Sequence, residues 1–162
     1  MVAYSFRPQF VQPILSGAKR QTIRPHRAGR SRHARPGEEV QLYTGMRTRR
    51  CTLIGRAMVE SVHQVELMFS GPSEGYVLDA RFTTADLYKS YVNTFARADG
   101  FKDWRELKAF WAEEHPGLDR FEGVLIKWRD FKPAGVEPGI SKEFDAALDR
   151  AKTRTRGYGV RR

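Results

Sequence analysis

The long run from Cys51 to Met68 constrains the fold more than any other segment of the chain. Small or apolar residues recur at every second position of its first half, which predicts a β-strand with one buried face. That face carries Leu53, Gly55, Ala57 and Val59. Because single strands are usually shorter than this run, we expect it to bend at Gly55 or near Ser61. The segment therefore predicts a strongly curved sheet.

The remaining elements are short. Strands are predicted over residues 2–6, 20–24, 39–44, 76–82 and 121–131. A short helix around residues 12–16 ends at Gly17, which supplies a positive φ. Two longer helices are predicted from Thr83, capped with Asp86, and from Asp103, capped with Glu106. Three tryptophans have helix or strand spacing and are predicted to lie in the core: Trp104, Trp111 and Trp128.

The order of these elements predicts an α+β fold, because strands and helices do not alternate as βαβ units. A small antiparallel β-barrel, curved or closed, with helices covering its ends fits this order best. Residues 1–131 form this domain in our interpretation. Residues 132–162 form a basic C-terminal tail with one weak helix over residues 144–151.

Several bulk features limit the class of protein. The single cysteine, Cys51, is interpreted as a small core residue in a reducing compartment. The four histidines lack metal-ligand spacing, so neither a metal nor a cofactor is predicted. The N-terminal residues lack a signal-peptide pattern, and no apolar run is long enough to span a bilayer. We therefore expect a cytoplasmic protein without a membrane partner.

Positive charge is concentrated in one part of the chain. The net charge is +10, and residues 17–50 carry ten Lys or Arg against two acidic residues. Such clustering favours a polyanionic partner over a merely solubilising surface, although charge alone does not separate nucleic acid from an anionic membrane. Residues 25–37 are rich in Pro, Gly and Arg and are predicted to form a mobile loop.

The segment from Gly17 to Arg24 is the candidate site. Lys19, Thr22 and Arg24 lie close together in sequence, a combination that suits a phosphate, a nucleobase or both. On a flat strand Thr22 and Arg24 share a face, whereas Lys19 points to the opposite one. Lys19 therefore joins them only if it lies in the turn after Gly17 or on a bulge.

Four motifs resemble the ASCH domain, which is related to PUA RNA-binding domains. They are Gly17-x-Lys19-x-x-Thr22-x-Arg24, the segment Pro36 to Tyr43, the turn Asp99-Gly100-Phe101 and the segment Phe121 to Trp128. The resemblance covers roughly residues 3–131. It implies a PUA-like β-barrel whose cleft is lined by the Lys-x-x-Thr-x-Arg segment.

Some small bacterial ASCH proteins remove the acyl group from N-acetylated cytidine, and others are ribonucleases. The resemblance implies that Lys19, Thr22 and Asp99 match the catalytic set of the amidohydrolases, in which the acid is glutamate. A threonine needs a neighbouring base, and a lysine becomes one when burial or a nearby cation lowers its pKa. Asp99 would orient Lys19 through a charge-assisted hydrogen bond.

Three functions are consistent with these residues. The first is binding of RNA or another single-stranded nucleic acid, with one nucleotide or modified base in the cleft, through Arg20, Arg24, Arg27, Arg30, Arg32, Arg35 and Tyr43. The second is hydrolysis, either of acylated cytidine or of RNA without a metal. The third is a module that binds an acidic protein. Structural roles compete: Lys19 as a surface lysine, Thr22 as a β-former, Arg24 as a loop anchor and Asp99 as a turn residue.

Overall fold

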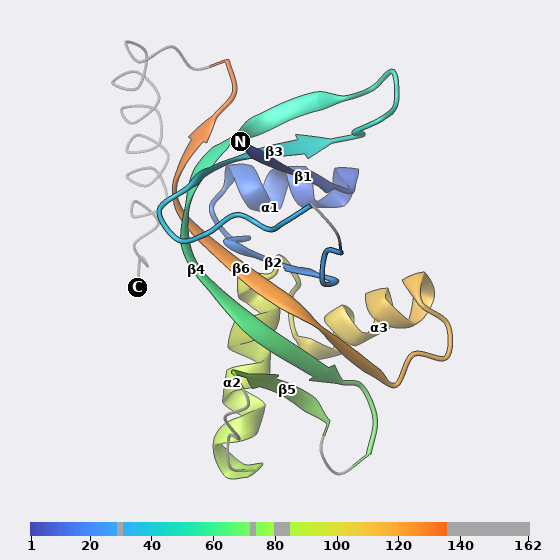
Figure 1. Ribbon diagram of the computed structural model, residues 1–162. Helices are drawn as coiled ribbons and strands as arrows, with labels where there is room; N and C mark the ends of the chain where they lie inside the picture. Colours follow the sequence, from blue (N-terminus) through green and yellow to red (C-terminus); the bar gives the residue numbers. More distant parts are fainter. Residues whose placement is uncertain (29–30, 72–73, 80–84, 136–162) are drawn as a thin grey trace, which may run out of the picture.

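The computed structural model describes residues 1–28, 31–71, 74–79 and 85–135 (Figure 1). In chain order the elements are β1 (Val2–Phe6), η1 (Pro8–Phe10), α1 (Val11–Leu15), β2 (Gln21–Arg24), β3 (Glu39–Thr44), β4 (Thr52–Met68), β5 (Gly75–Leu78), α2 (Ala85–Ala98), α3 (Trp104–Glu114) and β6 (Arg120–Pro133). The expected cap at Thr83 and the expected helix over residues 144–151 lie outside the described residues, as does most of the 132–162 segment.

The α+β class is as predicted, but the closed antiparallel barrel is wrong. The strands are ordered β1-β3-β4-β6-β2, with β5 also paired to β4. β1 pairs with β3 in parallel, and the chain between them is long enough for the crossover of a dozen or more residues that a parallel pair needs. Within the described residues no ladder joins the edge strands β1 and β2. The sheet is therefore mixed and open.

The long strand β4 forms the spine of the sheet and bends where the sequence predicts. It pairs with β6 along one side, and with β3 and then β5 along the other. Its register against β3 shifts between Gly55 and Leu53, and its register against β6 shifts between Val59 and Ser61. Each shift places an extra residue on β4, and such β-bulges increase local bend and twist.

The curved sheet wraps around α1, which lies on its concave side (Figure 1). Ile14 of α1 is completely buried there. Gly17 ends the helix at a φ of 75°, as its sequence position predicts. Trp104, Trp111 and Trp128 are 5%, 8% and 3% exposed, which confirms them as core residues. By contrast, Cys51 is exposed, because it closes the turn before β4 and donates its amide to Thr48 O.

The turn between α2 and α3 is tightly capped on both sides. Phe101 N donates to Ala96 O and Gly100 N donates to Arg97 O, the pair of bonds of a Schellman motif with Gly100 at a φ of 92°. Asp103 then caps α3 by accepting from Glu106 N at 2.9 Å. The Glu106 carboxylate accepts from Lys102 N. These caps fix Asp99, the residue between α2 and Gly100.

Candidate functional site

A cavity of about 170 Å³ opens at the seam between the two edge strands. β1 contributes Ser5 and Phe6 to it, and β2 contributes Thr22 and Arg24. Lys19, Asp99 and four residues that sequence reasoning did not assign to a site complete the main contacts: Arg7, Phe10, Phe110 and Trp111. The helical spacing of Phe10 and Trp111 predicts that both are buried, but no pattern in the sequence predicts that they lie around Lys19. All three residues of the predicted catalytic set line this one cavity.

Lys19 reaches the cavity because it lies before β2, in the turn after Gly17. Its amide donates to Pro13 O at 2.8 Å, which holds the turn against α1. The amide of Arg20 donates to Ala98 O at 2.8 Å, and this bond ties the start of β2 to the end of α2. This placement meets the condition under which Lys19 and Thr22 share a site.

The Lys19 ammonium group binds both the side chain and the main chain of Asp99. Nζ lies 2.9 Å from Asp99 Oδ1 and also donates to the Asp99 main-chain oxygen. The residues are only 2% and 6% exposed, and Nζ lies 4.5 Å from the centroid of the Phe10 ring. Such a pair is costly to bury, since each ion loses its hydration.

Burial shifts both groups toward their neutral forms. Desolvation lowers the pKa of Lys19, opposed by Asp99, and nearby Arg24 lowers it further. Desolvation also raises the pKa of Asp99, opposed by Lys19 and Arg24. Perturbed titratable groups in a cleft are typical of functional sites, although structural ion pairs also produce them.

Arg24 joins the two edge strands across the open seam. Its Nη2 donates to Ser5 O at 2.6 Å, and its Nε donates to Thr22 Oγ1 at 3.1 Å. Thr22 and Arg24 thus share one face of β2, as their spacing predicts. Thr22 is 4% exposed, and its hydroxyl oxygen is polarised by a guanidinium group. Arg24 anchors the seam and faces the cavity at the same time.

The basic loop is attached to this seam through Tyr4. The guanidinium carbons of Arg24 and Arg27 lie 5.6 and 5.4 Å from the centroid of the Tyr4 ring. The Tyr4 hydroxyl accepts from Ala34 N at 3.1 Å. The described part of the loop contains neither helix nor strand, as predicted, but several contacts hold it to the core. Positive charge therefore extends from the cavity into the loop.

The other predicted binding residues are scattered. Arg32 makes two bonds to Glu38, at 2.8 and 2.7 Å, and these bonds hold the pKa of Glu38 at about 2. Arg35 is exposed beside them, and Arg20 lines a separate groove. Tyr43 is half-buried and alternates with the buried Leu42, so it points to the opposite face of β3 and does not line the Lys19 cavity. Arg30 lies outside the described residues.

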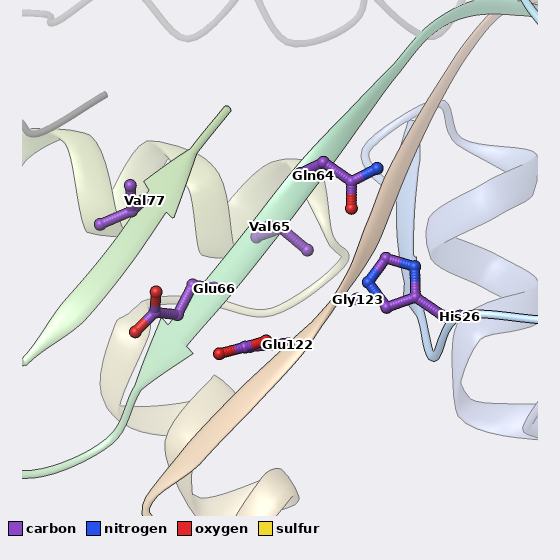
Figure 2. Close-up of a pocket in the computed structure, with 7 residues that line it drawn as sticks. All are labelled: His26, Gln64, Val65, Glu66, Val77, Glu122 and Gly123. Atoms are coloured by element: carbon purple, nitrogen blue, oxygen red, sulfur yellow. The ribbon is translucent and has the colours of Figure 1, made fainter. Parts of the chain in front are cut away.

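A larger cavity, of about 230 Å³, is lined by residues of β4, β5 and β6 and of the loop after β2 (Figure 2). It takes His26 from the loop after β2, and its carboxylates are Glu66 of β4 and Glu122 of β6. Both carboxylates pair with Arg120, at 2.7 and 2.9 Å. An acidic lining of this kind repels a polyanion, so we place the candidate site at Lys19.

Neither a protein-family model nor a curated protein sequence matches the chain. Three solved structures are similar to it. The first is of ASCH from Zymomonas mobilis, with 15% identity, a TM-score of 0.48 and coverage of 81% of this chain and 68% of the other. ASCH is the family that the sequence motifs resemble.

The other two structures are of mutants of ASCH from the same organism. A tyrosine-to-phenylalanine mutant has 18% identity and a TM-score of 0.44, and covers 89% of this chain and 80% of that one. A serine-to-alanine mutant has 19% identity and a TM-score of 0.44, and covers 89% and 78%. Within the described ranges no helix is both long and apolar enough to cross a membrane.

Proposed function

We propose that this chain is an ASCH-type domain of PUA-like fold that binds single-stranded RNA and takes one base into the Lys19 cavity. The observation that carries this proposal is the buried pair of Lys19 and Asp99, which lies beside aromatic rings in a recess connected to a basic loop. The cost of burying the pair is hard to explain by stability alone, because apolar replacements of buried ion pairs are often neutral or stabilising.

The size and lining of the cavity support a base rather than a whole nucleotide. At about 170 Å³ it is smaller than the roughly 300–1,000 Å³ typical of ligand pockets. Phe6 and Phe10 offer ring contacts, and the Lys19 and Arg24 groups offer hydrogen-bond donors to the acceptor atoms of a base. A base in a single strand exposes both its faces and its edges, whereas a paired base does not.

Titration of short RNA oligonucleotides at low ionic strength tests this function. We expect binding that weakens as salt rises, and a loss of affinity in Thr22→Val and Arg24→Gln. Thr52→Val is the control, because Thr52 is exposed at the start of β4 and does not line the cavity. No association of the wild-type protein at low salt would contradict the proposal.

A second candidate function is hydrolysis of an acyl group from N-acetylated cytidine. It is favoured by one observation, the lowered pKa of Lys19 in the same cavity as the Thr22 hydroxyl. A neutral Lys19 amine would accept the hydroxyl proton while Thr22 Oγ1 attacks the amide carbon. Arg24 Nε, already bonded to that oxygen, would stabilise the negative charge that the oxygen gains as its proton leaves. The cytosine amine would leave with the proton that Lys19 took up, and the acyl group would remain on Thr22. Water would then remove the acyl group from Thr22.

Acetate release from N-acetylcytidine distinguishes this second function. Activity that is lost both in Lys19→Ala and in the isosteric Thr22→Val, with Thr22→Val still folded, supports the amidohydrolase. RNA fragmentation in the presence of a chelator, also lost in Lys19→Ala, points instead to a metal-independent ribonuclease. Salt-dependent RNA binding without either activity leaves the binding function alone.

A further inference from the structure

A second groove lies behind the turn that carries Lys19. Its volume is about 570 Å³, and it is formed where α1, the start of β2 and the turn after α2 come together. Three cationic residues line it: Arg20, Arg97 and Lys102. Among the described residues no acidic side chain lines it, and its apolar surface includes Pro13 and Phe101. The groove is thus basic, whereas the cavity of Figure 2 is acidic.

The three cations of the groove share the lack of an ion-pair partner. Arg20, Arg97 and Lys102 are exposed, and no carboxylate of the described residues lies within ion-pair distance of them. Some other surface cations are paired with carboxylates, namely Arg7, Arg32, Arg56, Lys108, Arg120 and Arg129, whereas exposed residues such as Arg47 and Arg49 have no ion pair within the described part of the chain. Three cations without a carboxylate around one groove repel one another, and an anionic ligand would relieve this repulsion.

A wall one chain thick separates the groove from the Lys19 cavity. Ala18 and Arg20 line the groove, whereas Lys19 between them lines the cavity. The turn after α2 forms the second segment of the wall, in which Gly100 lines the groove and Asp99 lines the cavity. The two segments of this wall are in contact, since a Cβ on Gly100 would lie 3.1 Å from Lys19 Cβ. Only this layer of chain therefore separates a ligand in the groove from the site.

We infer that this groove binds the phosphodiester backbone of single-stranded RNA, next to the nucleotide whose base enters the Lys19 cavity. The inference rests on the proposed function. A positive groove that follows the backbone beside a base-binding recess is a general solution for single strands. The groove is also large enough for more than one phosphate, and its apolar floor suits ribose or an unstacked base.

The test compares oligonucleotide lengths in the double variant Arg97→Gln/Lys102→Gln. Neither residue lines the Lys19 cavity, so binding of a mononucleotide should stay unchanged. Binding of a hexanucleotide should weaken about tenfold or more at low salt. The slope of log affinity against log salt should fall by about 1.4, since each phosphate contact on a single strand contributes about 0.7. The double variant Arg49→Gln/Lys132→Gln is the control, because it removes the same charge from exposed positions outside both cavities.

Each outcome decides the inference. A loss in hexanucleotide affinity no larger than that of the control variant overturns it and leaves the proposed function intact. An equal loss for the mononucleotide also overturns it, because the effect would then act through the Lys19 site. RNA binding that is retained while binding of polyglutamate is lost overturns it in favour of an acidic protein partner. A wild-type protein that binds no RNA overturns both proposals.

Discussion

Lys19 and Asp99 are separated by 80 positions in the sequence, yet Lys19 Nζ lies 2.9 Å from Asp99 Oδ1 in the interior. The turn after Gly17 brings one partner and the C-terminal cap of α2 brings the other. Asp99 ends α2, so its main-chain oxygen has no further helical turn to bond and instead accepts from the same ammonium group. One lysine thus satisfies both the charge and the open carbonyl of the helix end.

Replacing Lys19 alone should destabilise the protein strongly. Lys19→Met fills a similar volume but leaves Asp99 as a buried charge without its main partner, and loss of one partner of a buried pair costs about 3–5 kcal/mol. Lys19→Met/Asp99→Asn removes the charge as well and should recover a large part of that loss. Urea unfolding of the three proteins measures both steps. If the double variant is as unstable as Lys19→Met, the pair does not behave as a buried charge couple.

Sequence reasoning named Lys19, Thr22, Arg24 and Asp99, which line one cavity, but it predicted neither the shape of the cavity nor its aromatic lining. The capping pattern at Asp99-Gly100 and Asp103 and the stop at Gly17 follow from local rules, and the structure has them where they are expected. The open seam does not follow from local rules. It depends on a parallel pairing of β1 with β3, a long-range choice that leaves β1 and β2 as edges. The prediction of a closed barrel failed at this point.

The basic loop shows a second limit of sequence reasoning. Its arginines form one uniform field in the sequence, but the structure gives them different partners. Arg27 lies over Tyr4, Arg32 is bound to Glu38, and Arg20 faces a different groove from Arg24. A count of charges in the sequence does not predict the partner of each arginine, because each partner is set by contacts between distant segments.

The stability of the pair should depend on pH in two opposite directions. The folded pKa of Lys19 lies below its ordinary 10.5, so its contribution to stability is present above 10.5 and is lost as pH falls through the folded value. The folded pKa of Asp99 lies above its ordinary 3.8, so its contribution is present below 3.8 and is lost as pH rises through the folded value.

The unfolding free energy of the wild-type protein minus that of Lys19→Met/Asp99→Asn isolates these two contributions, because the double variant carries neither titrating group. The difference in unfolding free energy should have its minimum between the two folded pKa values and rise toward both extremes. Chemical denaturation at a series of pH values provides the curve. A difference that is flat with pH, or that has a maximum at neutral pH, would mean that burial is not the dominant influence.

Gly100→Ala should weaken nucleotide binding in addition to the loss of stability that backbone strain causes. Gly100 has a φ of 92°, and a Cβ there would lie 3.1 Å from Lys19 Cβ and Cδ. Gly117→Ala is the matched control, since Gly117 has a φ of 80° and nothing lies within 4 Å of its added Cβ. Left-handed strain costs about 1–2 kcal/mol at either position. Only Gly100→Ala should also displace Lys19 and weaken nucleotide binding, as measured by unfolding and titration. Equal losses of binding in both variants would contradict this contact.

Arg32 should contribute less to RNA binding than Arg27, although both belong to the same loop. Two bonds commit the Arg32 guanidinium group to Glu38, whereas Arg27 donates to Arg32 O and lies over Tyr4. The pKa of Glu38 is lowered to about 2, so its contribution is present above 4.5 and is lost only as pH falls through about 2. Glu38 therefore stays charged, and the pair persists, throughout the neutral range.

Glu38→Gln should release Arg32 and increase the affinity for RNA. Arg32→Gln should reduce affinity only slightly in the wild-type background, but as much as Arg27→Gln does once Glu38 is replaced. The four combinations of Arg32→Gln and Glu38→Gln form a double-mutant cycle, with oligonucleotide affinity at two salt concentrations as the measurement. The coupling should shrink at the higher salt concentration, because exposed charges are screened. Additive effects of the two substitutions would show that Glu38 does not compete with RNA for Arg32.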